Sequence, residues 1–369
     1  EGEPPKEGGL PSIPDRRKLG DRNQYPGGNN AVRETSRRRL LRGATAAGAA
    51  LAAPHLALAQ SSGVTATDWP RRTVTIIVPA APGGTLDALA RFLAQAMSSV
   101  LGRNVVVENA GGGNGLIGMQ RMMRAEADGH TLAFGNNGIF AAHVSLNPDS
   151  GFDPRRDIAP VGLVAHVPMV LSAGPRSGIR TLPALLDHIR RNGERATFGT
   201  GGVGSTSYLA PAYLLHLTGL KATLVSYRGA GPAMNDLAAG VVDAVIDQTV
   251  TMIPAHRGGT AVALATSARE RLPQLPEVPT FAEAGVPGFD LVVWNALAAP
   301  RDTPPAVIAK AAEAVEAALS DAEMRRRLSD LAAIAPAAEE RGPQALGTLI
   351  ARDVVKWIEV VRQTGLARQ

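Results

Sequence analysis

The chain has 369 residues and no cysteine, and its 38 Lys and Arg residues exceed its 33 Asp and Glu residues by five. This length permits one large domain or two, and the lack of cysteine excludes disulfides, thiolate metal ligands and thiol-linked lipids. Residues 1–59 hold ten basic and six acidic residues, so the remainder is nearly neutral. A basic face with aromatic platforms is not evident, which argues against a nucleic-acid partner.

The first 59 residues have the order of an export signal. Ser36-Arg37-Arg38-Arg39-Leu40-Leu41-Arg42 resembles the twin-arginine motif, a weakly apolar stretch covers residues 44–53, and Ala57-Leu58-Ala59 fits a cleavage site. The apolar stretch is too short to span a bilayer. We therefore expect cleavage near Ala59 and a periplasmic mature protein, with a basic amphipathic helix as the alternative. Residues 1–35 are rich in Gly, Pro and charge and predict a disordered extension.

From Trp69 onward, patterns typical of strands and helices alternate. The first series predicts strands at 74–78, 105–107 and 130–135, one long strand or two short ones at 159–174, and helices at 86–101 and 117–125. The second series predicts helices at 182–191, 205–217 and 232–239, a strand and loop at 196–202, strands at 221–227, 242–247, 260–267 and 289–300, and two or three terminal helices within 304–363. This rhythm predicts an α/β fold with parallel sheets and right-handed crossovers.

The two series are joined by long strand-like segments near residues 165–172 and 289–298. More than one crossover therefore connects two lobes, and a cleft lies between them. We place lobe 1 at residues 69–170 and 288–369, and lobe 2 at residues 171–287. Ligands of open α/β sheets bind beyond the carboxyl ends of the strands, so the loops that follow the strands should face this cleft.

Two glycine corners stand where a strand passes into a helix. Pro82-Gly83-Gly84-Thr85 follows the first strand, and residues 199–205 take the same place in the second series. Such corners present free backbone N–H groups and the positive end of a helix dipole, which together favour an anion. Asp87 lies in the first turn of its helix, where the dipole alone explains it; alternatively it fixes the glycine loop or meets a ligand ammonium or a bridging water.

Motifs for catalysis are weak. Residues 113–118 and 199–204 match G-x-G-x-x-G, but no acidic residue follows about 20 positions later: the first match offers Asn136 and Asn137, and the second offers Tyr227 and Arg228. An exported nicotinamide-dependent oxidoreductase is thus an alternative only. The sequence has no G-x-x-x-x-G-K-[ST], no G-x-S-x-G and no H-E-x-x-H motif. We therefore expect a binding protein without enzymatic activity, cofactor or metal.

Five collinear segments carry a resemblance to a known family: residues 69–97, 101–118, 127–138, 226–247 and 275–289. They resemble the Bug-type extracytoplasmic solute receptors of tripartite tricarboxylate transporters. The resemblance implies a two-lobe, Venus-flytrap fold like that of periplasmic binding proteins, with a parallel-rich sheet flanked by helices in each lobe. It also implies a receptor that closes on a small organic acid and delivers it to membrane permease subunits. We expect a monomer.

The resemblance also implies a ligand site in which backbone N–H groups, hydroxyls and ordered water hold the ligand carboxylates. The expected site residues are Ala81, Pro82, Gly83, Gly84, Thr85, Asp87, Asn137, Thr200, Gly202, Ser205, Thr206, Ser207 and Asp247. Tyr208 stands where the family commonly has a histidine, and Ala80 where it often has an aromatic residue, so the identity of the acid stays open. Arg228 either pairs with a distal carboxylate or lies on the lobe surface. A receptor that serves a sensor partner is a further alternative.

Overall fold

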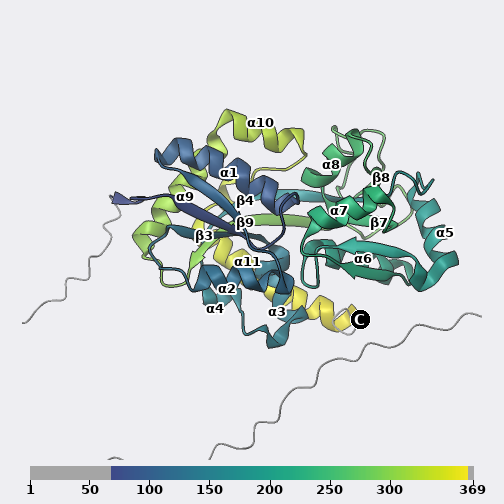
Figure 1. Ribbon diagram of the computed structural model, residues 1–369, viewed down its shortest axis with the longest axis horizontal. Coiled ribbons are helices and arrows are strands. Elements are labelled where there is room, and N and C mark those ends of the chain that lie inside the picture. Colours follow the sequence, from purple (N-terminus) through teal and green to yellow (C-terminus); the bar gives the residue numbers. More distant parts are fainter. Residues whose placement is uncertain (1–67, 365–369) are drawn as a thin grey trace, which may run out of the picture. The chain divides into compact units, whose positions relative to one another are not determined.

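The structure of the protein, a computed structural model, describes residues 68–364 (Figure 1). The predicted extension and export signal lie outside the described residues. Within the described part, no helix combines the length and apolar character needed to cross a membrane.

In the part of the chain that the structure describes, nine strands form a mixed sheet in the order β2-β1-β3-β9-β4-β7-β5-β6, and β8 pairs with β4. Their bounds are β1 Val74–Val78, β2 Val105–Asn109, β3 Thr131–Asn136, β4 Ile158–Ala173, β5 Thr197–Thr200, β6 Thr223–Ser226, β7 Ala244–Gln248, β8 Val262–Thr266 and β9 Val292–Pro300. Strand β1 is parallel to β2 and β3, and β5 is parallel to β6 and β7. The predicted parallel modules are therefore present in both halves of the chain, and antiparallel strands join them.

Strands β4 and β9 link the two lobes. Residues Ile158–Pro168 of β4 pair with β9, whereas Met169–Ala173 pair with β7 and β8. Strand β9 in turn pairs with β3 of the first lobe. One long strand thus passes from one lobe into the other, and its neighbour β9 returns beside it (Figure 1).

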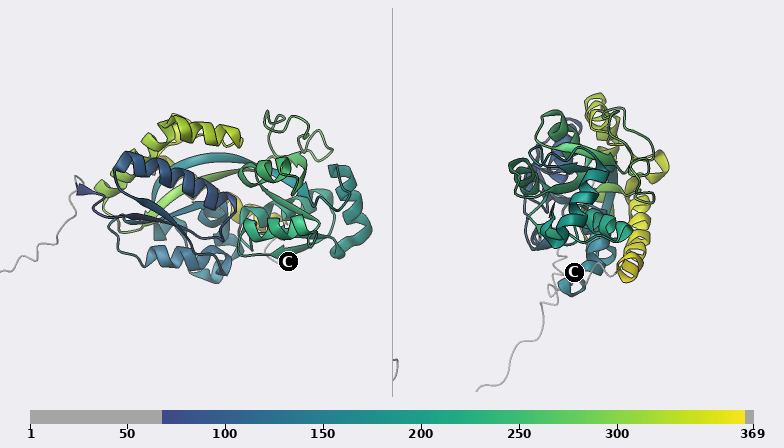
Figure 2. Two further views of the ribbon diagram at one scale, coloured as in Figure 1. Left: turned by 45° about the horizontal axis from the view of Figure 1, so that its top comes forward. Right: turned by 90° about the vertical axis from the view of Figure 1, so that its right-hand side faces the viewer.

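Helices cover both faces of the sheet in each lobe (Figure 2). The longer helices are α1 Thr85–Leu101, α2 Leu116–Met123, α5 Leu182–Asn192, α6 Thr206–Thr218, α7 Ala230–Ala239, α8 Thr249–Arg257, α9 Pro305–Ser320, α10 Ala322–Asp330 and α11 Gly342–Thr364. In the first lobe, α1, α9 and α10 pack in one core and α2 and α11 in another. In the second lobe, α5 and α6 share one core and α7 and α8 the other.

Between β3 and β4 the chain forms short helical turns that the sequence patterns did not predict. They comprise a π-helical turn, Gly138–Ala142, followed by α3, His143–Leu146, and by α4, Pro154–Asp157. Phe140 of the π-helical turn is fully buried and stacks on Trp294 of β9. These turns place the residues that follow β3 against the strands that cross between the lobes.

Candidate functional site

A small cavity of ≈ 60 Å³ lies between the lobes at the carboxyl ends of β1, β3, β5 and β7. This is the edge at which open α/β sheets bind ligands. Because roughly 10–15 Å³ of such space holds one water molecule, the cavity has room for about four to six groups of that size. Its walls come from the loop after β1, the glycine run after β2, the loop after β5, the start of α7 and the end of β7.

Three helices begin at this cavity. Helices α1, α6 and α7 start at Thr85, Thr206 and Ala230, and all three residues line the wall. The first N–H groups of a helix lack partners within the helix, and its N-terminus carries a partial positive charge. Three such ends on one small space make it favourable for an anion, even though no Lys, Arg or His of residues 68–364 lines the cavity.

Hydroxyl groups add further polar atoms to the wall formed by α6. The Ser205 Oγ caps α6 by accepting a hydrogen bond from the Tyr208 N–H at 3.2 Å, and it lies 3.2 Å from the Ser207 Oγ. The Ser207 Oγ accepts a bond from the Gly201 N–H at 2.8 Å. These bonds hold the loop after β5 in a fixed shape, so the donors that it presents are preorganised.

Asp87 holds the first glycine corner in place. Its Oδ2 accepts a hydrogen bond from the Gly83 N–H at 3.1 Å, and its Oδ1 lies 2.8 Å from the Arg91 Nη2. Burial raises the pKa of Asp87, but the bonds from Arg91 and Gly83 outweigh burial and leave the pKa below its usual value. The carboxylate is therefore ionised and engaged with the loop, and Gly83, at φ +85°, adopts a conformation that favours glycine.

Asp247 is the second carboxyl group of the cavity. It is the last residue but one of β7 and is 2% exposed, and its Oδ2 lies 3.4 Å from the Thr85 Oγ1 of the opposite lobe. Burial raises its pKa to about 6, and hydrogen bonds from Thr251, the Gln248 backbone and Thr85 only partly oppose this rise. Asp247 therefore changes its charge at a pH of about 6, at which most organic acids are already ionised.

The two lobes touch directly around the cavity. The Ala81 N–H donates to the Arg228 carbonyl oxygen at 2.8 Å, and the Thr85 Oγ1 lies 2.6 Å from the Thr251 Oγ1. A Cβ atom added at Gly231 would lie 2.3 Å from the Pro82 carbonyl oxygen. The structure therefore shows the lobes closed on each other, with glycine at a point where no side chain fits.

Eight of the expected site residues line the cavity: Ala81, Gly84, Thr85, Asp87, Ser205, Thr206, Ser207 and Asp247. Pro82 and Gly83 belong to the same corner without lining the wall. Thr200 and Gly202 support the second corner, where the Gly202 N–H donates to the Thr200 Oγ1 at 3.4 Å. Asn137 lies elsewhere, because its side chain lines a different cavity on the other face of the crossing strands.

Several wall residues were not expected from the sequence, namely Asn114, Gly115, Asn136, Ile139, Gly229, Ala230 and Gln248. The sequence did contain a signal for two of these residues. Gly229 is the last residue before α7 and Ala230 begins it, so they stand where a strand passes into a helix, as the two recognised glycine corners do. Asn136 ends a strand whose carboxyl end faces the cleft, and its Nδ2 lies 3.4 Å from the Thr206 Oγ1.

An outer space of ≈ 500 Å³ continues the cavity toward the surface. It shares five wall residues with the inner cavity, Pro79, Ala81, Asn114, Gly115 and Gly201. Arg228 is the basic residue among those that line this outer space. In the described residues, no group of three or more His, Asp or Glu side chains is placed to hold a metal ion.

Comparison with known proteins gives consistent matches along the chain. The model of the tripartite tricarboxylate transporter family receptor matches residues 89–366. A UPF0065 protein of Agrobacterium vitis is 36% identical over 312 residues, which cover 85% of this chain and 88% of the relative.

Two solved structures share both sequence and fold with this chain. The periplasmic binding protein BugD is 33% identical with a TM-score of 0.77, and the match covers 81% of this chain and 99% of BugD. MatC from Rhodopseudomonas palustris, solved with bound malate, is 37% identical with a TM-score of 0.76, and the match covers 79% of this chain and 100% of MatC.

Proposed function

The chain belongs to the family of tripartite tricarboxylate transporter receptors, and from this premise we propose that it captures one small organic carboxylate between its lobes in the periplasm. The observation that carries this proposal is the convergence of the starts of α1, α6 and α7 on one cavity, which no basic side chain of the described residues lines. Membrane permease subunits then receive the acid from the closed receptor. Residues 1–59 supply the export signal, with cleavage near Ala59.

In this proposal the ligand carboxylate accepts hydrogen bonds from backbone N–H groups at the three helix starts. Gly84 and Thr85 serve from the first lobe, and Thr206, Ser207 and Ala230 serve from the second. The N–H groups of Ala81 and Ser205 already donate to the carbonyl oxygens of Arg228 and Gly202, so these two residues shape the wall of the cavity. Pro82, Gly83, Asp87, Thr200 and Gly202 shape the two corners rather than touch the ligand. Asp247 selects a ligand that offers it a hydroxyl, ammonium or water-bridged donor, because a bare carboxylate beside an ionised Asp247 would be repelled. Malate in MatC carries such a hydroxyl group.

We further propose that the protein is not an enzyme and takes no cofactor. Its two cavity carboxyl groups already have structural partners, since Asp87 bonds to Gly83 and Arg91, and Asp247 to Thr85. The ligand is released unchanged when the lobes open. Closure is favoured only by a ligand that binds the closed form better, through simultaneous contacts with both lobes.

Mass spectrometry of the acid that co-purifies with the protein, followed by a thermal-shift panel of mono-, di- and tricarboxylates, tests the proposed function. At a ligand concentration of 100 Kd, binding adds about 2.7 kcal/mol of stability, and we expect a rise in Tm of roughly 5 °C. Gly83→Val should fold but lose this rise, because a β-branched residue is strained at φ +85°. No rise with any acid, or a fluorescence response to nicotinamide cofactors, would contradict the proposal.

Arg228 should discriminate between acids with one and two carboxylates. If an inner carboxylate occupies the cavity, a second one reaches the outer space that Arg228 lines. Because this side chain is exposed, we expect Arg228→Gln to weaken binding of a dicarboxylate by only about two- to fivefold. Binding of the monocarboxylate of equal length should not change. Calorimetric titration of both acids measures this ratio, and an equal loss for both would assign Arg228 to lobe closure instead.

A further inference from the structure

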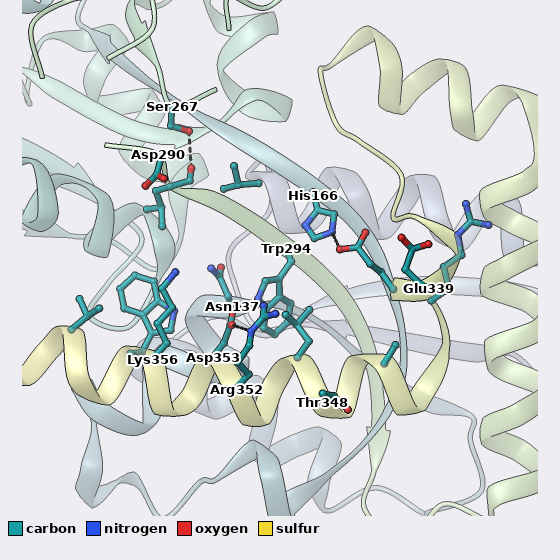
Figure 3. A pocket seen from close by; sticks show the side chains of 18 of the residues that line it. Asn137, His166, Ser267, Asp290, Trp294, Glu339, Thr348, Arg352, Asp353 and Lys356 are labelled. Atoms are coloured by element: carbon teal, nitrogen blue, oxygen red, sulfur yellow. Dashed lines mark hydrogen bonds and ion pairs between the residues drawn. The ribbon is translucent and has the colours of Figure 1, made fainter. Parts of the chain in front are cut away.

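A second and larger cavity, of ≈ 910 Å³, lies on the opposite face of the crossing strands (Figure 3). His166 of β4 and Trp294 of β9 form its floor, and α11 of the first lobe forms one wall. Tyr213 of the second lobe and Asp290, in the segment that leads into β9, form the other wall. The cavity therefore has walls from both lobes, as the carboxylate site does, but it lies on the opposite face of β4 and β9.

The alternation of side chains along a strand separates the two cavities. Trp294 lines the large cavity, whereas the Nδ2 of the next residue, Asn295, donates at 2.7 Å to the Oε1 of Gln248, which lines the carboxylate site. At the end of β3, Asn136 lines the carboxylate site and Asn137 lines the large cavity. The large cavity is thus a separate space with its own residues.

Helix α11 is built to form a wall of this cavity. One side of the helix, with Leu346, Ile350 and Val354, is buried in the core of the first lobe. The next side faces the cavity at helical spacing, with Thr348, Arg352 and Lys356 among its residues (Figure 3). The helix is tied to the floor of the cavity, because the Trp294 Nε1 donates to the Asp353 Oδ2 at 2.7 Å. The other oxygen of this carboxylate, Oδ1, lies 3.1 Å from the Arg352 Nε.

Asn137 supplies an unused polar group at this cavity. Its side chain is 3% exposed, and its Oδ1 is buried with no hydrogen-bond partner in the described residues. A buried amide oxygen without a partner has lost its hydration and gained nothing in exchange. The amide lies beside Trp294 at the wall of the cavity (Figure 3), so a turn of this amide brings its oxygen to a guest that donates a hydrogen bond.

The remaining lining defines what kind of guest fits. Trp294 and Trp357, which are 4% and 6% exposed, give the cavity aromatic walls. Four basic and four acidic side chains line it, so their charges balance and a guest with net charge gains little. Several of these charges already have partners: Arg352 pairs with Asp353, and Glu340 with His166. A volume of this size is typical of sites for small organic molecules.

We propose that this cavity is a second binding site, for a flat aromatic molecule without net charge whose ring N–H donates to the Asn137 Oδ1. The aromatic walls bury the ring, and the hydrogen bond orients it. This site is independent of the carboxylate site in both residues and chemistry.

A pair of matched probes tests the proposal on the full chain. The probes are 5-fluoroindole, which carries a ring N–H, and 5-fluoro-1-methylindole, which does not, and ¹⁹F NMR follows their titration without background from the protein. We expect saturable binding of 5-fluoroindole and binding about fivefold weaker for the methylated probe. Asn137→Ala should reduce this difference to none, because the acceptor is gone.

A blocking variant locates the bound probe. Thr348→Trp places a bulky side chain from α11 into the cavity and should abolish binding of 5-fluoroindole. Val355→Trp is the matched control, because Val355 lies on the same helix, is 62% exposed and does not line the cavity. A cooperative melting transition shows that each variant is folded. Equal affinity for the two probes in the wild-type protein, or binding that survives Thr348→Trp, would overturn the proposal.

Discussion

Replacing Gly231 with alanine is expected to abolish tight ligand binding while leaving each lobe folded. The added Cβ would lie 2.3 Å from the Pro82 carbonyl oxygen, which belongs to the facing corner of the other lobe. Gly231 is the second residue of α7, where alanine favours the helix, so the variant should be at least as stable as the wild type. The lobes then stop short of closure, and we expect affinity for the acid to fall by about tenfold or more.

Isothermal titration with the acid identified by mass spectrometry measures this loss. Gly347→Ala is the matched control, because it also places alanine in a helix but meets only the Pro160 Cγ at 3.7 Å, an ordinary contact. Small-angle scattering reports whether the acid still compacts each protein. Wild-type affinity in Gly231→Ala would show that the lobes bind the acid without reaching the closed arrangement.

Asp247→Asn is expected to stabilise the ligand-free protein at neutral pH. The pKa of Asp247 is about 6 in the folded protein, against 3.8 as the ordinary value, so the folded state holds this proton more tightly than the unfolded state does. The stability that this group contributes is present in full below pH 4 and is lost as the pH rises through 6. Between pH 4 and the pH at which the group is fully ionised, its contribution to the free energy of unfolding falls by on the order of 3 kcal/mol.

Urea unfolding at several pH values measures this effect as the difference between the wild-type and Asp247→Asn proteins. The difference should be small at pH 4 and should grow in favour of the variant up to about pH 7, because other titrating groups cancel between the two proteins. Asparagine keeps an acceptor for the Thr85 hydroxyl, so the contact between the lobes survives. A difference that does not change with pH would show that Asp247 is ionised without cost in its buried position.

The local chemistry of the site was predictable from the sequence because it depends on short-range rules. Gly83 and Gly84 before a helical pattern predicted a helix start, and α1 begins at Thr85 with Gly84 as its N-cap. The same rule applies at Gly229, before α7, but this corner was not singled out, because the sequence pattern placed the start of that helix at Pro232. Two of the three helix starts were thus identified, and the third followed the same pattern.

The long-range features were not predictable from one sequence. Asn136 and Asn137 are adjacent and of one type, yet they face different cavities, because the last residue of β3 alternates with the first residue beyond it. The passage of β4 from β9 to β7 at Met169 depends on which strands it meets, and no local signal marks the change of partner. The pairing of strands in the folded protein decides which partner a strand takes and which cavity a side chain faces, and the local β-propensity of the residues does not.

Strands β4 and β9 carry a binding space on each of their faces, and both spaces are walled by the same two lobes. The pair of strands therefore acts as a hinge between the lobes. A bend of this hinge that narrows the cavity on one face of the strands widens the cavity on the other face. A molecule bound in the large cavity would hold the carboxylate site closed, so its binding would set how long the receptor retains the acid. By reciprocity, the bound acid would change the affinity of the large cavity for its own guest.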